Sequence, residues 1–104
     1  MEKEALAIYL DGDVSLVAGT HTHIQTADER ILSKGTAYIT DVGMTGPEES
    51  VIGTEKEIAL QRFMTQIPLK MEIADTALMI NGVFVEIDTQ TGKATGIERI
   101  YEKI

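Results

Sequence analysis

The chain has 104 residues, no cysteine and a net charge of −8, from 17 acidic and 9 basic residues. This length fits one domain at most, and the lack of cysteine excludes disulfides, thiolate metal sites and cysteine nucleophiles. The acidic balance, without a basic cluster, argues against binding to duplex nucleic acid. No apolar stretch is long enough to span a bilayer, and the first residues lack the pattern of a signal peptide. We therefore expect a cytoplasmic protein that does not associate with membranes.

The N-terminal part predicts a helix followed by a strand. Residues 2–10 are rich in helix formers, and the spacing of Ala5, Ile8 and Tyr9 puts them on one apolar face. Gly12 then provides a C-cap. Residues 14–18 form a short apolar run, which predicts a strand buried on both faces. The polar segment 19–32 is expected to be a loop.

The middle of the chain predicts a second strand and a second helix. The strand covers residues 36–40, and a glycine-rich loop, residues 41–47, follows its carboxyl end. Thr54 and Glu57 form a capping box, and Pro68 follows the end of the predicted helix. The apolar side of this helix consists of Ile58, Leu60, Phe63, Met64 and Ile67.

The C-terminal part has the pattern of strands. Residues 69–74 alternate loosely, and residues 77–80 and 83–87 flank Asn81-Gly82, a strong signal for a two-residue hairpin turn. Residues 88–93 predict a further turn and residues 94–101 the last strand. The fold class is therefore mixed α/β with a closing β-meander. The chain starts with a helix that no strand precedes, whereas helices of doubly wound sheets follow strands.

His21 and His23, the two histidines of the chain, are the first candidate site. They follow the carboxyl end of a predicted strand, where open α/β sheets bind ligands. In an extended loop, side chains two residues apart project to the same side, and neutral imidazole is a common metal ligand. The other interpretation is a pair of surface histidines in a polar loop, since a catalytic zinc site usually needs three protein ligands.

Asp41, at the end of the second strand, is the next candidate. Its carboxylate could orient a metal-ligating histidine, or it could cap its own loop. Gly43 and Gly46 could bring backbone N–H groups to a phosphate, or could simply permit a turn. The charged residues 28–30 are interpreted as a solvated face.

Two segments resemble a known family. Residues 19–30, Gly-Thr-His-Thr-His-Ile-Gln-Thr-Ala-Asp-Glu-Arg, and residues 36–47, Thr-Ala-Tyr-Ile-Thr-Asp-Val-Gly-Met-Thr-Gly-Pro, are similar to bacterial calcineurin-like metallophosphoesterases described as 2′,3′-cyclic-nucleotide 2′-phosphodiesterases. The segments around Thr54 and from Asn81 to Ile100 are similar too, so the resemblance covers nearly the whole chain. It implies a four-layer α/β/β/α sandwich with a two-metal site.

The resemblance also implies a function and roles for single residues. The implied reaction is hydrolysis of a cyclic nucleotide or similar small phosphoester by a metal-bound hydroxide. His21 and His23 would be metal ligands, mainly one for each ion, with His23 at the ion shared with the family's first aspartate. Thr20, Asp41 and Gly43 would support the ligands or the substrate. The ions would be two divalent cations, since imidazole and oxygen ligands suit iron, manganese or zinc.

The chain departs from this family in its length. Family members are more than twice as long, and their other metal ligands and a general-acid histidine lie upstream. Residues 1–104 therefore resemble a single partial domain, the C-terminal half of the metallophosphoesterase sandwich. Three possibilities follow: a part of an enzyme that needs the upstream sequence, a non-catalytic and oligomeric fragment, or a chain whose missing ligands come from a complementing N-terminal half. An exposed apolar face on half a sandwich would favour association.

Overall fold

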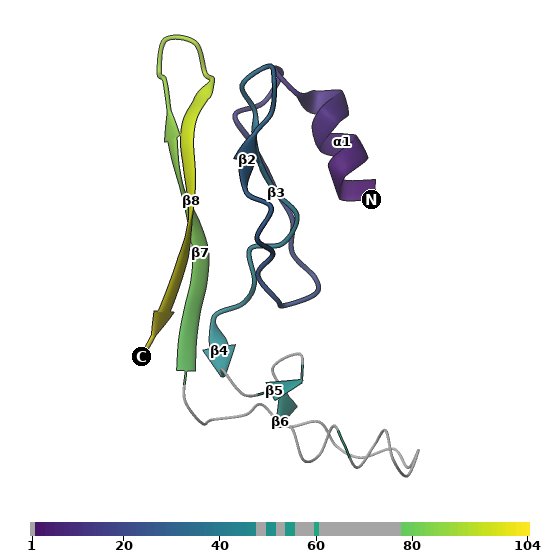
Figure 1. The fold of residues 1–104 in the computed structure, drawn as a ribbon, viewed down its shortest axis with the longest axis vertical. Coiled ribbons are helices and arrows are strands. Elements are labelled where there is room, and N and C mark those ends of the chain that lie inside the picture. Colours follow the sequence, from purple (N-terminus) through teal and green to yellow (C-terminus); the bar gives the residue numbers. More distant parts are fainter. Residues whose placement is uncertain (1, 48–49, 52–53, 56–59, 61–77) are drawn as a thin grey trace.

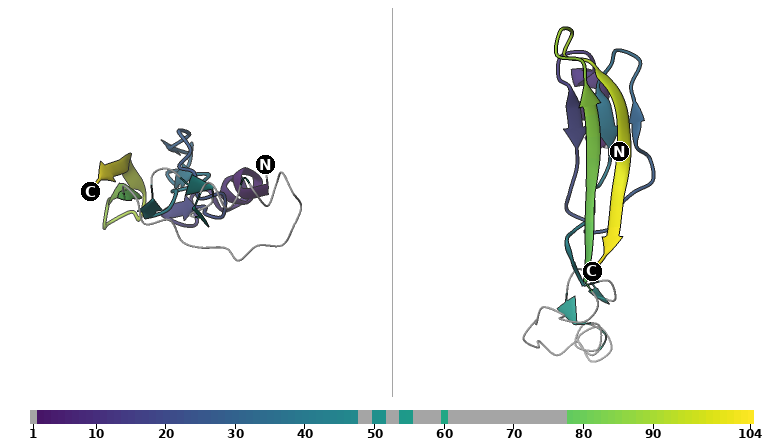
Figure 2. Two further views of the ribbon diagram at one scale, coloured as in Figure 1. Left: turned by 90° about the horizontal axis from the view of Figure 1, so that it is seen from below. Right: turned by 90° about the vertical axis from the view of Figure 1, so that its left-hand side faces the viewer.

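The computed structural model describes residues 2–47, 50–51, 54–55, 60 and 78–104. They form three layers (Figure 1). Helix α1 (Glu2–Leu10) lies on one side of a small sheet, and a long β-hairpin lies on the other. The left view in Figure 2 shows the same order of helix, sheet and hairpin, and the right view shows the hairpin in front of the first sheet. This arrangement confirms a mixed α/β class.

Helix α1 has the predicted bounds, and its predicted apolar face is exposed. Ala7 is the buried residue of this helix, and Ala5, Ile8 and Tyr9 are all exposed. The reason is that α1 contacts the sheet side through Ala7 and Lys3, which lie four residues apart on the same helix face. The predicted apolar face points away from the described sheet.

The first sheet has the order β1-β3-β2. Strand β1 (Leu16–Ala18) runs parallel to β3 (Ala37–Ile39), and β2 (Arg30–Ile31) runs antiparallel to β3. The central strand β3 was predicted and is fully buried. Strand β2 lies where only a loop was expected. The prediction that the first strand is buried on both faces is wrong, because Leu16 and Ala18 are exposed and Val17, on the other face, is only half-buried.

The second sheet has the order β4-β7-β8 and contains the long hairpin. Strand β4 (Gly46–Pro47) pairs with β7 (Leu78–Ile87), which pairs antiparallel with β8 (Ala94–Lys103). The turn at residues 88–93 is confirmed: the Asp88 amide donates to the Lys93 carbonyl at 2.8 Å, and Gly92 adopts a φ of +75°.

The hairpin turn predicted at Asn81-Gly82 is wrong, because β7 continues through both residues. Gly82 is paired with Ile100 of β8 in the ladder. The Asn81 side chain donates from Nδ2 to the Met44 carbonyl at 2.8 Å, so it ties the strand to the loop after β3. These contacts hold the dipeptide in a strand in spite of its turn propensity. The predicted meander is thus one hairpin with a short third strand.

Two further predictions fall mainly outside the described residues. Thr54, the predicted helix cap, lies in strand β6 (Thr54–Glu55), which pairs with β5 (Ser50–Val51). Most of the helix predicted to follow Thr54, and the strand predicted at 69–74, lie outside the described residues. In the described ranges, no helix is long and apolar enough to cross a membrane.

Polar contacts join the hairpin to the first sheet. At the turn end, the Ala94 amide donates to the Gly35 carbonyl at 2.8 Å, and the Ser15 hydroxyl donates to the Gly92 carbonyl at 2.6 Å. At the other end, the Gln25 side chain contacts both strands of the hairpin. Residues 19–29, here called the histidine loop, are therefore fixed between β1, β3 and the hairpin.

Candidate functional site

Gly19 determines where the histidine loop begins. Its amide donates to the Ile39 carbonyl at 3.1 Å, and its carbonyl accepts from the Val42 amide at 2.9 Å. A Cβ at this position would lie 2.0 Å from the Thr40 carbonyl oxygen, so no larger residue fits without moving the backbone. The loop therefore leaves β1 in close contact with the carboxyl end of β3.

The backbone of the loop is not extended, which corrects one premise of the metal prediction. His21 has a φ of 108° and His23 a φ of 67°. A non-glycine residue with positive φ is uncommon and strained, and such strain is found preferentially at functional sites. Strand alternation therefore does not place the two imidazoles on the same side.

Thr22, between the two histidines, is held by Asp41. The Asp41 carboxylate accepts from the Thr22 amide at 2.8 Å and from the Thr22 hydroxyl at 2.7 Å. The same carboxylate accepts from the Gly43 amide at 2.9 Å. Asp41 is fully buried. It therefore does what one prediction proposed, capping its own loop, and it also fixes the residue between the histidines.

The electrostatics of Asp41 favour its charged form. Burial desolvates the carboxylate and acts to raise its pKa, but the donors from Thr22 and Gly43 and the charge of Lys3 outweigh this effect. The net result is a pKa below the usual value for aspartate. In the part of the chain that the structure describes, Asp41 makes no hydrogen bond to a histidine; its connection to them runs through Thr22.

Thr20 and Gly43 also lie at this loop. The Lys3 side chain donates to the Thr20 carbonyl and lies 3.9 Å from the Asp41 carboxylate. Gly43 has a φ of +86°, and a Cβ there would lie 2.9 Å from the Asn81 Cβ, so glycine is required on both counts. Sequence reasoning missed Lys3, because only the docking of α1 brings it to the loop.

Asp28 is a second anchor, which the interpretation as a solvated face missed. Its carboxylate accepts from the Thr26 hydroxyl at 2.7 Å, the Thr40 amide at 3.1 Å and the Thr40 hydroxyl. Burial acts to raise the Asp28 pKa, but these hydrogen bonds lower it overall. Asp28 thus ties the end of the loop to β3. The signal for it was Thr26, two residues before Asp28, since a threonine hydroxyl at this spacing can donate to the aspartate.

The two imidazoles differ in their surroundings, since His21 is exposed and His23 is half-buried. The Nδ1 atom of His23 is buried with no hydrogen-bond partner among the described residues. A metal-ligating histidine normally engages both ring nitrogens, one with the metal and one with a partner. No group of three or more potential metal-ligating side chains occurs within the described ranges. The metal role of His21 and His23 therefore stays a prediction.

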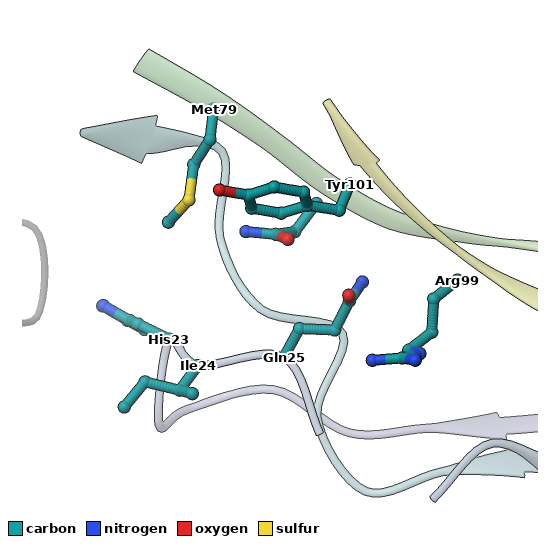
Figure 3. Close-up of a pocket in the computed structure, with 7 residues that line it drawn as sticks. His23, Ile24, Gln25, Met79, Arg99 and Tyr101 are labelled. Carbon is teal, nitrogen blue, oxygen red and sulfur yellow. The ribbon is translucent and has the colours of Figure 1, made fainter. Parts of the chain in front are cut away.

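A pocket of about 740 Å³ opens between the histidine loop and the hairpin. Figure 3 shows His23, Ile24 and Gln25 on the loop facing Met79 of β7 and Arg99 and Tyr101 of β8. Asn81 completes the lining. The pocket was not predicted, since it depends on how the hairpin packs against the loop.

Solved structures share this fold. The chain superimposes on a hypothetical protein from Thermus thermophilus with a TM-score of 0.91 and 42% identity, covering 98% of this chain and 40% of that one. A structure described as a novel phosphatase from Mycoplasma pneumoniae gives a TM-score of 0.93 and 43% identity, covering 98% of this chain and 37% of the other. The fold is thus one that occurs in a phosphatase.

Sequence comparisons identify the family. The chain is 54% identical over 99 residues to the 2′,3′-cyclic-nucleotide 2′-phosphodiesterase of Bacillus subtilis (strain 168), and 44% identical over 100 residues to a putative phosphatase/phosphodiesterase of Mycoplasma pneumoniae. Each match covers 95% of this chain but only 38% and 36% of those relatives. A model of the YmdB-like proteins matches residues 1–100. The chain therefore belongs to the YmdB-like protein family, and it spans little more than a third of these relatives.

Proposed function

We propose that this chain contributes His21 and His23 to a two-metal site of a phosphodiesterase that hydrolyses cyclic nucleotides or similar small phosphoesters. The observation that carries the proposal is the fixed His-Thr-His loop, in which buried Asp41 holds Thr22 between the two imidazoles. The family membership and the names of the Bacillus and Mycoplasma relatives support the same reaction class.

The residues of the chain would position the ions and the substrate. Divalent cations at such a site neutralise phosphate charge and activate water, and imidazole suits iron, manganese or zinc. Asp41 would keep the two histidines in place through Thr22. The chain carries a net charge of −8, which repels a phosphoester, so bound cations would also reverse the local charge.

The remaining ligands would come from sequence that this chain does not contain. We propose that the complete protein is the four-layer α/β/β/α sandwich of calcineurin-like enzymes, in which the three described layers form one part. The alternative is a non-catalytic, oligomeric chain. It is favoured by the exposed apolar side chains of α1, where Leu6, Ile8 and Tyr9 are 53%, 59% and 76% exposed.

A chimera tests the proposal. This chain replaces the segment that it matches in the Bacillus subtilis relative, and bound metal and hydrolysis of 2′,3′-cyclic AMP are measured. We expect the chimera to bind metal and to be active. His21→Gly and His23→Gly are expected to lower activity by more than about 100-fold, together with metal content. Glycine is chosen because it adopts a positive φ without strain.

The controls separate ligand loss from misfolding. Gln90→Ala, in the exposed turn of the hairpin, should leave both readouts unchanged. The 104-residue chain alone should bind metal weakly and show no hydrolysis. A folded, active chimera in which both glycine variants keep full activity would show that the proposal is wrong.

A further inference from the structure

The pocket beside His23 has the size of a site for a small organic molecule. Its volume of about 740 Å³ lies within the range of ligand pockets, roughly 300–1,000 Å³. A phosphate group alone would leave most of this space empty. Since His23 lies both in the histidine loop and in the pocket wall, a molecule whose phosphate is at the loop can extend into the pocket.

The apolar part of the wall suits a planar ring. Figure 3 shows the Tyr101 ring across the pocket, with its hydroxyl end beside Met79 and with Ile24 on the opposite, loop side. Aromatic faces stack on nucleobases without strong sequence preference, and a methionine thioether packs favourably against aromatic edges. Tyr101 comes from β8 and Met79 from β7, so the hairpin supplies this surface.

The polar part of the wall includes an acceptor without a donor. Asn81 donates from Nδ2 to the Met44 carbonyl, which fixes the carboxamide, whereas its Oδ1 is buried and has no partner among the described residues. Nucleobases carry N–H donors, but a cyclic phosphodiester carries none. Asn81 and Tyr101 both line the pocket and are cross-strand neighbours, so the acceptor lies beside the aromatic part of the wall.

Arg99 provides donors at the β8 side of the pocket. Its Nε donates to the Glu29 carboxylate at 2.9 Å, which orients the guanidinium plane. The group can stack on a base or donate to ring nitrogen and carbonyl acceptors. From these walls we propose that the pocket holds the nucleobase of the cyclic nucleotide whose phosphate lies at His21 and His23. This inference rests on the proposed function.

Titration of the full 104-residue chain with adenosine, followed by NMR, tests the inference without metal or turnover. We expect saturable shifts of the Met79 methyl and Tyr101 ring signals. Tyr101→Ala and Asn81→Leu should each weaken binding about tenfold or more. Phe84→Ala, on the outer face of the same hairpin and 52% exposed, should leave the affinity unchanged. Inorganic phosphate should not shift the pocket signals.

A kinetic experiment in the chimera provides a second measurement. Tyr101→Ala should raise the KM for 2′,3′-cyclic AMP about tenfold, with little effect on bis(p-nitrophenyl) phosphate, which has no base. No adenosine shifts at the pocket, or equal effects on both substrates, would overturn the inference. Adenosine binding in a chimera without metal or hydrolysis would instead contradict the proposed function, so the two failures are distinguishable.

Discussion

At the scale of single residues, Asp41 links the stability of the loop to pH. Its carboxylate accepts three hydrogen bonds from Thr22 and Gly43 while it is fully buried. Its pKa is below the usual value, because these donors and Lys3 outweigh desolvation. A depressed pKa in the folded state means that the stabilisation is complete above the unfolded pKa of about 3.9 and is lost as the pH falls through the folded value.

Asp41→Asn should therefore lower the free energy of unfolding by about 2 kcal/mol at neutral pH, because an amide replaces a charged acceptor. The difference from the wild-type chain should shrink as the pH falls below about 3.9, because the unfolded carboxylate binds a proton there while the folded one, with its lower pKa, stays charged. Urea denaturation over a pH series measures the free energy of unfolding of the wild-type and Asp41→Asn chains. Asp13→Asn, at an exposed position, should have almost no effect. If the difference in the free energy of unfolding between the two chains stays constant down to acid pH, the charge of Asp41 is not its cause.

At the scale of elements, the contact between β1 and β3 depends on Gly19. Gly19→Ala would place a Cβ 2.0 Å from the Thr40 carbonyl oxygen, a backbone atom that cannot turn away. We expect a loss of about 3 kcal/mol of stability or more, measured by chemical denaturation. Hydrogen exchange should show the earliest opening at the carboxyl ends of these two strands.

Gly82→Ala is the matched control in β7. A Cβ at Gly82 has no atom within 4 Å, and the residue has no positive φ. The substitution should change stability by less than about 1 kcal/mol, and a small gain is expected since alanine restricts the unfolded chain. Equal losses of stability in Gly19→Ala and Gly82→Ala would show that the close approach of Gly19 to the Thr40 carbonyl does not cause the loss.

The elements also show how far the sequence predicts this fold. Local signals gave the bounds of α1, the core of β3 and the turn at residues 88–93, because capping, β-branched residues and glycine act within a few residues. Tertiary contacts decided the rest. Asn81-Gly82 stays in a strand because Met44 and Ile100 are its partners, and the apolar face of α1 is exposed because Ala7 makes the contact instead.

At the scale of the whole molecule, the candidate site is formed by three layers. The histidine pair was a candidate from its residue type and its place after a strand, and its role as a metal ligand stays a prediction; Asp41 was a candidate from its place at a strand end. The charge of Lys3 and the pocket with Arg99 and Tyr101 could not be predicted, because they reach the loop only when α1 and the hairpin pack on opposite sides of the sheet. Such contacts join residues far apart in the chain, as Gln25 and Ile100 show with a separation of 75 positions.

Gln25 joins the loop to the hairpin, and its removal should loosen these two layers. Its Nε2 lies 3.0 Å from the Gly82 carbonyl, 3.1 Å from the Ile100 carbonyl and 3.3 Å from the Val42 carbonyl. Gln25→Leu keeps the size but leaves these acceptors without the donor, so we expect a loss of about 2 kcal/mol. Gln90→Leu, in the exposed turn, is the matched control and should have little effect.

Hydrogen exchange distinguishes a local change from a global one. In Gln25→Leu, the amides of β7 and β8 should exchange faster than those of β1 and β3, because the hairpin loses a link to the loop while the parallel pair keeps its own hydrogen bonds. Uniform acceleration in both sheets would mean that the chain unfolds as one unit and that Gln25 does not control the hairpin separately. Selective loosening would also enlarge the pocket at His23, since the loop and the hairpin are its two walls.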